Sequence, residues 1–145
     1  MVHETLISFD HEKTMVKKYQ YWTLLVRKKQ ITLGSLVMVI NNDIKCFKDI
    51  PEQAFTEMKK VTQEIETNLG ALIGYDKINY LALMMVDPQV HYHVIPRYEQ
   101  PKNFGGRTFI DAGWPALPRF DQYEELEGDI LQKLRDHLRK NWESI

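Results

Sequence analysis

Two histidines separated by a single residue, His91 and His93, are the side chains of this sequence best suited to chemistry. They lie in residues 89–97, QVHYHVIPR, whose valines, tyrosine and isoleucine predict a β-strand. Because side chains alternate between the two faces of a strand, both imidazoles share one face, together with Gln89. A rise of about 3.3 Å per residue places them within about 7 Å of each other, so both can act on one ligand.

Three roles are open to this pair of imidazoles. They can be half-exposed strand residues without a chemical role, or two ligands of a metal site that needs a third ligand. In the third role, one imidazole is a nucleophile or base and the other orients it or balances its charge. We favour catalysis, then metal binding, because an ordinary histidine pKa of about 6.5 leaves much of the nucleophilic neutral form at neutral pH. The open positions for a third metal ligand are Asp87, Asp111, His3, His11 and His137.

Four segments have the aliphatic, β-branched and aromatic content of strands. Residues 77–86 are nearly continuously apolar, which predicts a central strand covered on both faces. Residues 36–40 follow Gly34-Ser35 and end at a run of turn-forming residues. The predicted strands are residues 19–27, 36–40, 77–86 and 89–98.

Two further segments carry apolar residues at helical spacing. The first helix is predicted over residues 51–69, ended by Gly70 and Gly74. The second is predicted over residues 121–142, starting at a capping Asp121. Strands that follow one another with two helices on one face indicate an α+β fold, with an antiparallel sheet of about five strands and two main helices.

The overall composition indicates one domain over residues 1–145, with a core at 19–98 and an irregular, Gly- and Pro-containing arm at 99–120. With 19 basic and 20 acidic residues, the chain lacks the charge that would draw it to nucleic acid or an anionic membrane. Its one cysteine, Cys46, excludes an intrachain disulfide and a thiolate metal cluster. Residues 1–13 lack the pattern of a signal peptide, so we expect a cytoplasmic protein. We expect no cofactor.

Residues 89–97 resemble the signature of the histidine-triad (HIT) family, His-x-His-x-His followed by apolar residues and often Pro-Arg. Residues 33–40 look like the family's Pro-Gly-His-apolar strand, and the resemblance covers roughly residues 19–98. It implies a homodimeric nucleotidyl hydrolase or transferase that acts on nucleoside phosphoanhydrides or phosphoramidates, such as diadenosine polyphosphates. In the family the middle histidine attacks the α-phosphorus and the third supports it. These positions correspond to His91 and His93, and the first triad position to Gln89.

The sequence departs from the family pattern at several positions. Gln89 replaces a histidine and can form hydrogen bonds but cannot carry a proton charge. Ser35 stands where the family commonly has the histidine after Pro-Gly, and a short connection over residues 84–88 replaces the family's Gly-Gln-Ser/Thr phosphate loop. Arg27 falls about where many members place an aspartate that holds the ribose hydroxyls, which favours a more anionic or a non-nucleoside ligand. The predicted substrate-binding residues are Asn79, Ser35, Arg97, Arg27 and Trp114.

The leading hypothesis is therefore an enzyme that uses His91 as nucleophile, with His93 and Gln89 in support and no metal. The alternative is a nucleotide- or phosphate-binding module of the same fold with weakened catalysis, which Gln89, Ser35 and the absent phosphate loop motivate. A His-x-His metalloprotein is the third hypothesis. The expected partner is a small-molecule nucleotide or phosphate ester, neither a nucleic acid nor a membrane.

Overall fold

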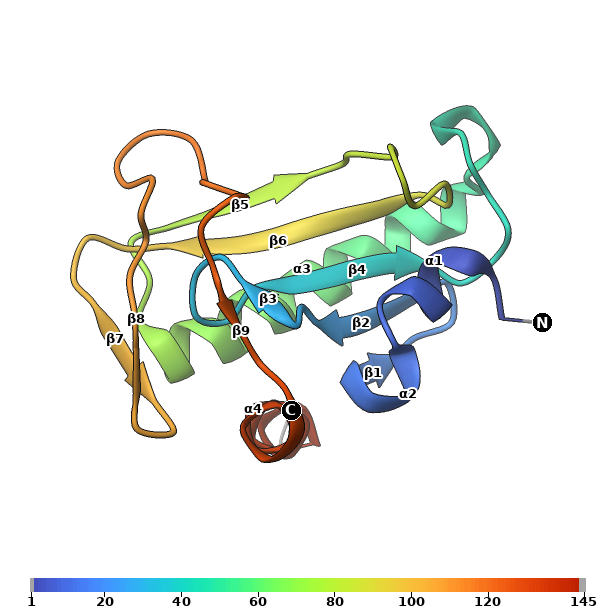
Figure 1. Cartoon of the computed structure of the whole chain (residues 1–145). Coiled ribbons are helices and arrows are strands. Elements are labelled where there is room, and N and C mark those ends of the chain that lie inside the picture. The colour runs from blue at the N-terminus through green and yellow to red at the C-terminus, as the bar shows by residue number, and fades with distance from the viewer. Residues whose placement is uncertain (1, 144–145) are drawn as a thin grey trace.

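A five-stranded antiparallel sheet forms the centre of the structure, a computed structural model that describes residues 2–143 (Figure 1). Each strand pairs with its neighbours in antiparallel register, in the order β1-β2-β4-β6-β5. The predicted antiparallel sheet of about five strands is confirmed. The strands are β1 (Met15–Lys18), β2 (Trp22–Val26), β4 (Leu36–Ile40), β5 (Lys77–Leu81) and β6 (His91–Arg97).

The two faces of this sheet are covered differently. Alternate residues such as Leu24, Met38 and Val94 face the larger core cluster, which the long helix α3 (Glu52–Ile73) covers from behind the sheet in Figure 1. The opposite face carries a small cluster formed by Leu6, Leu25, Val37 and Val39, under the short N-terminal helices α1 (Glu4–Ser8) and α2 (His11–Thr14). The histidines of β6 lie on this second face.

The first predicted helix continues further than the sequence indicated. Gly70 lies inside α3 and does not end it, because one glycine in a helix interior costs only about 1 kcal/mol. The helix ends at Ile73, where Gly74 has a left-handed backbone with φ of 63° and its N–H donates to the Gly70 carbonyl.

The second predicted helix begins later than Asp121, and this prediction is wrong for residues 121–127. These residues include β9 (Glu124–Glu125), which pairs with β3 (Lys29–Gln30), and the Leu126 N–H donates to the Lys28 carbonyl at 2.8 Å. These hydrogen bonds to another segment replace the predicted first helical turns. Helix α4 (Gly128–Glu143) then packs along the β1 edge of the sheet (Figure 1). It also contacts α3, and its Leu134 lies in the same core cluster as Val61 and Ile65 of α3, so the two main helices cover the same face, as predicted.

Strand β5 lies at the edge of the sheet, so the prediction of a central strand over residues 77–86 is wrong. It pairs with β6 alone and ends at Leu81, and most of its side chains are half-buried. The apolar residues that lengthened the prediction belong to the following loop, where Leu83, Met85 and Val86 are exposed. A continuous apolar run here combines a half-buried edge strand with a loop.

The arm at residues 99–120 is less irregular than predicted. It contains a hairpin of β7 (Lys102–Phe104) and β8 (Arg107–Phe109), joined by Gly105 and Gly106, both with positive φ. A short 3₁₀ helix, η1 (Phe47–Asp49), precedes α3. Within residues 2–143, none of the helices combines the length and the apolar content needed to cross a bilayer.

Candidate active site

His91 and His93 lie side by side on the open face of β6, as the alternation predicts. Their ring centroids are 5.1 Å apart and the ring planes are nearly perpendicular, at 83°. Both side chains are buried, with exposed fractions of 1% and 7%. Their strand partners on β4 are Val39 and Val37, whose small side chains belong to the apolar cluster of that face.

The hydrogen bond of His91 fixes which of its nitrogens is free. Its Nδ1 lies 2.8 Å from the backbone carbonyl oxygen of Gln89. Because a carbonyl oxygen can only accept, Nδ1 carries the proton in this contact. The lone pair of the neutral ring is then on Nε2, which is the atom available to act as a nucleophile or a base.

His93 is held in its neutral form. Burial, followed by the positive charge of Arg27 and by that of His91 in its protonated form, lowers the pKa of His93 to about 3. Its Nδ1 is buried and has no hydrogen-bond partner among the described residues. The rings of Phe120 and Phe9 contact the imidazole edge-on, with centroid distances of 5.4 and 6.1 Å, and contribute to this apolar surrounding.

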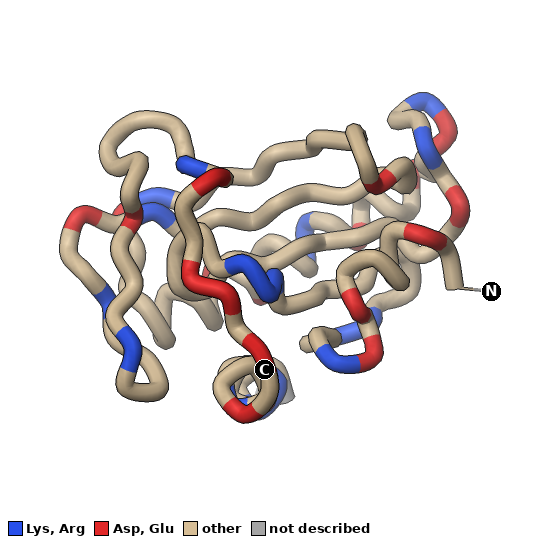
Figure 2. Tube along the Cα trace, viewed as in Figure 1, with Lys and Arg blue, Asp and Glu red and all other residues tan. Residues whose placement is uncertain are grey.

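The two histidines line a cavity of about 520 Å³ on this face of the sheet. Its walls come from the end of α1, the β2–β3 turn, the β5–β6 loop and the segment before β9. Figure 2 shows the basic β2–β3 turn beside the acidic β9, in agreement with the pairing of Lys29 with Glu125. The remaining lining residues are Ser8, Phe9, Arg27, Lys28, Leu83, Met85, Val86, Asp87 and Phe120.

Arg27 is the predicted substrate-binding residue that the structure brings to the histidines. Its guanidinium carbon lies 5.4 Å from the centroid of the Phe120 ring, which also contacts His93. Its Nη1 donates to the Lys29 carbonyl at 2.7 Å, whereas its Nε is buried without a partner among the described residues. A half-buried cation whose Nε is a buried, unused donor therefore lines the same cavity as the two imidazoles.

The sequence matches the model of a known protein family. The model of the HIT domain family matches residues 10–100. The chain belongs to the HIT family. Membership supports a nucleotide-binding protein of the hydrolase or transferase kind. No curated protein matched the sequence.

Solved HIT structures share the fold at low sequence identity. A histidine triad protein from Marinobacter aquaeolei VT8 matches with a TM-score of 0.74 and 19% identity, over 99% of this chain and 96% of that chain. One from Sinorhizobium meliloti 1021 matches with a TM-score of 0.72 and 19% identity, over 97% and 96%. A hypothetical histidine triad nucleotide-binding protein from Sulfolobus tokodaii strain7 has a TM-score of 0.68 and 16% identity, over 97% and 93%.

Gln89, at the first triad position of this HIT domain, directs its side chain away from the cavity. Its Oε1 accepts hydrogen bonds from the Thr5 N–H at 3.0 Å and from the Thr5 hydroxyl, and its Nε2 donates to Asp43 at 2.9 Å. The Gln89 N–H donates to the same hydroxyl at 3.1 Å. The side chain therefore fastens α1 to the sheet. Gln89 contacts His91 through its backbone carbonyl and not through its amide.

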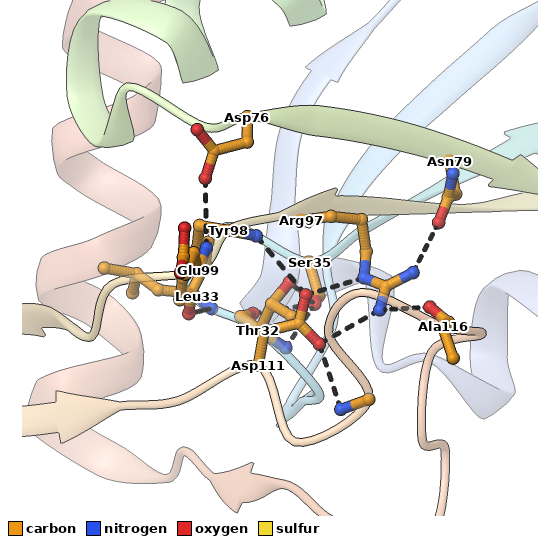
Figure 3. A network of polar contacts seen from close by, with 11 residues as sticks. Thr32, Leu33, Ser35, Asp76, Asn79, Arg97, Tyr98, Glu99, Asp111 and Ala116 are labelled. Atoms are coloured by element: carbon orange, nitrogen blue, oxygen red, sulfur yellow. Dashed lines mark hydrogen bonds and ion pairs between the residues drawn. The ribbon is translucent and has the colours of Figure 1, made fainter.

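Two other predicted residues, Asn79 and Arg97, lie together in a separate cluster (Figure 3). Arg97 forms a buried ion pair with Asp111 at 2.7 Å, and its Nη1 donates to the Asn79 side-chain oxygen at 2.8 Å. Its Nη2 donates to the Ala116 carbonyl at 2.7 Å. Asn79, Arg97 and Trp114 line a different hollow of about 490 Å³, and none of them lines the cavity of the two histidines. These contacts fasten the arm to β5 and β6.

Ser35 is fully buried in the turn before β4, and it does not line the histidine cavity either. Its hydroxyl donates to the Thr32 carbonyl at 2.7 Å and accepts from the Thr32 N–H at 3.1 Å. Ser35 therefore closes the turn that leads into β4.

The sequence interpretation missed the two phenylalanines of the site. Phe9 and Phe120 come from opposite ends of the chain, and no local pattern marks either as a neighbour of β6. For the metal hypothesis, no group of three or more His, Cys, Asp or Glu side chains within residues 2–143 is arranged to hold an ion. His91 and His93 thus lack a described third ligand.

Proposed function

We propose that this HIT protein is a nucleotidyl hydrolase or transferase in which Nε2 of His91 attacks the α-phosphorus of a nucleoside phosphoanhydride or phosphoramidate. The observation that carries the proposal is the hydrogen bond from His91 Nδ1 to the Gln89 carbonyl. This bond leaves the lone pair of the ring on Nε2, inside a cavity that His91 shares with the neutral His93. Family membership and the resemblance of residues 89–97 to the HIT signature support the same chemistry.

The reaction has two displacement steps. In the first, the Nε2 lone pair forms a bond to phosphorus while the bond to the leaving oxygen or nitrogen breaks. The leaving group keeps the electron pair, and a leaving nitrogen also takes up a proton from the solvent. In the second, a water oxygen bonds to phosphorus, the P–Nε2 bond breaks, and the water releases a proton. The products are a nucleoside monophosphate and the leaving group. A transferase would replace the water with another acceptor.

The Gln89 carbonyl assists the first step. When Nε2 bonds to phosphorus, the imidazole ring becomes positively charged and its Nδ1–H becomes a stronger donor. The existing hydrogen bond of 2.8 Å to the carbonyl therefore strengthens as the covalent intermediate forms. Burial beneath Phe9 and Phe120 increases the effect, because electrostatic interactions are stronger in a less polar surrounding.

A second function, binding without turnover, rests on the first triad position. The Gln89 side chain is hydrogen-bonded to Thr5 and Asp43 and does not line the cavity, so it is not placed to contact a ligand there. A protein of this kind would be stabilised by a nucleotide but would release no product. The metalloprotein hypothesis lacks a comparable observation and is not proposed.

The deciding experiment measures AMP release from diadenosine tetraphosphate and from adenosine phosphoramidate. We expect wild-type protein to release AMP and His91→Ala to lose at least about a thousandfold in kcat. His137→Ala is the matched control, because His137 is an exposed histidine on α4 outside the cavity. A folded His91→Ala protein that keeps its turnover would exclude the covalent mechanism. Thermal stabilisation by AMP without turnover would favour the binding module.

The homodimer and the cytoplasmic location stay predictions from the family resemblance and the composition. Light scattering during size-exclusion chromatography separates the two assembly states, since one chain has a mass of 17.2 kDa. A mass near twice this value is expected. A single-chain mass at micromolar concentration would contradict the predicted homodimer.

A further inference from the structure

The side chains of the triad strand give the histidine cavity no positive charge that could stabilise a bound phosphoryl group. His93 is neutral, and His91 must keep its Nε2 lone pair to attack. Gln89 carries no charge, and its amide bonds to Thr5 and Asp43 outside the cavity. A phosphoryl group under attack carries negative charge on its non-bridging oxygens, and its stabilisation requires a nearby cation or several donors. The triad strand provides neither.

Of the three cationic side chains that line the cavity among the described residues, Arg27 is placed to supply this charge. Lys28 is already paired with Asp10 at 2.8 Å, and Lys29 is exposed, with its ammonium 5.2 Å from the centroid of the Tyr123 ring. Arg27 forms no ion pair with a described carboxylate. It shares the Phe120 ring with His93, at 5.4 Å in both cases.

The position of the Arg27 guanidinium is fixed before any ligand binds. Its Nη1 is held by the Lys29 carbonyl, the Phe120 ring lies against it, and its backbone N–H donates to the Ser35 carbonyl at 3.0 Å. Its Nε–H is buried and unsatisfied among the described residues. A buried donor on a charged group is unfavourable until it finds an acceptor, and a phosphoryl oxygen is a strong one.

We infer that Arg27 binds the non-bridging oxygens of the phosphoryl group that His91 attacks, and so supplies the positive charge that the triad strand lacks. This inference rests on the proposed function. It assigns the charge-stabilising role to the residue that directly follows β2, with a guanidinium in place of a protonated imidazole. The ligand class is a phosphoanhydride or phosphoramidate with two free oxygens at the reacting phosphorus, which match the planar guanidinium donors.

The test compares Arg27→Gln and Arg27→Lys with Lys59→Gln, which removes one positive charge from an exposed position on α3, behind the sheet. For Arg27→Gln we expect kcat to fall by about a hundredfold or more, with a smaller change in KM, because the charge acts mainly in the transition state. For Arg27→Lys we expect about a tenfold fall, since lysine keeps the charge but not the planar donors. Lys59→Gln should match wild type.

A second readout separates this inference from the proposed function. The affinity for AMP, measured by titration calorimetry, should fall at least about tenfold in Arg27→Gln and stay constant in Lys59→Gln. If turnover depends on His91 but Arg27→Gln changes kcat and AMP affinity by less than about threefold, the inference is overturned and the function stands. If wild type shows no turnover but binds AMP in an Arg27-dependent way, the function fails and the phosphate site stands. Should Arg27→Gln not fold, the same comparisons apply to Arg27→Lys.

Discussion

The buried, neutral His93 couples the stability of the fold to pH. In the unfolded chain His93 has an ordinary histidine pKa of 6.5, whereas in the folded protein its pKa is about 3. Between these values the unfolded state binds one proton more than the folded state. Acidification through this window therefore favours unfolding, and the stability that His93 contributes above pH 6.5 is lost as the pH falls toward 3.

The size of this loss follows from the two pKa values. Each pH unit within the window corresponds to about 1.4 kcal/mol for one proton. Lowering the pH from 7.5 to 4.5 crosses about two units of it, so His93 should account for about 3 kcal/mol of lost stability. The main cause is burial, followed by the positive charge of Arg27 and by that of His91 in its protonated form. Asp87 and Glu125 also line the cavity, but none of the ion pairs found within residues 2–143 joins either of them to His93.

The assay is urea unfolding at pH 7.5 and pH 4.5 of wild type, His93→Gln and the exposed-histidine control His137→Gln. Other groups also titrate in this range, but they are common to all three proteins and cancel in the comparison. We expect the acid-induced loss to be about 3 kcal/mol smaller in His93→Gln than in wild type, and the control to follow wild type. Equal losses in wild type and His93→Gln would refute the reasoning, because His93 would then titrate normally in the folded protein.

Two further predictions concern residues that fasten the rest of the chain to the sheet. Arg97→Met should lower the free energy of unfolding, measured in urea, by about 3–5 kcal/mol, because it leaves the buried Asp111 carboxylate without its cation; a loss below about 1 kcal/mol would contradict this. Gln89→Leu should cost about 2 kcal/mol, since the Thr5 N–H and hydroxyl lose their acceptor. Faster hydrogen exchange in α1, with unchanged exchange in α3, would locate that loss, whereas unchanged exchange in both helices would argue against the tether.

The features that the sequence predicted well are those that local backbone geometry determines. The period of two in residues 89–98 placed His91 and His93 on one face, because alternation is a property of any extended strand. Strand β4 has the predicted bounds, since Gly34-Ser35 before it and polar turn residues after it limit the apolar run on both sides.

The features that it predicted poorly depend on partners far along the chain. Gln89 interacts with Thr5, 84 residues away, so nothing near Gln89 indicates that its amide holds α1. Asn79 and Arg97 meet because β5 and β6 pair in one particular register, which the composition of either strand does not specify. Hydrogen bonding to β3 likewise determines where α4 begins, and this interaction overrides a favourable capping sequence at Asp121.

In the proposed mechanism, the positive charge that Gln89 cannot carry at the first triad position is supplied by Arg27. A glutamine at the first triad position cannot become charged, and its tether to Thr5 brings the end of α1, with Phe9, against the imidazoles. That apolar cover keeps His93 neutral, so positive charge must come from a group that stays protonated in a poorly hydrated site. A guanidinium does so, whereas a buried lysine or histidine loses its proton far more readily. Burial lowers the pKa of Arg27, but from so high a starting value that it keeps its charge wherever the fold is stable. Arg27, which directly follows β2, is thus the cation that a desolvated, glutamine-containing triad can use.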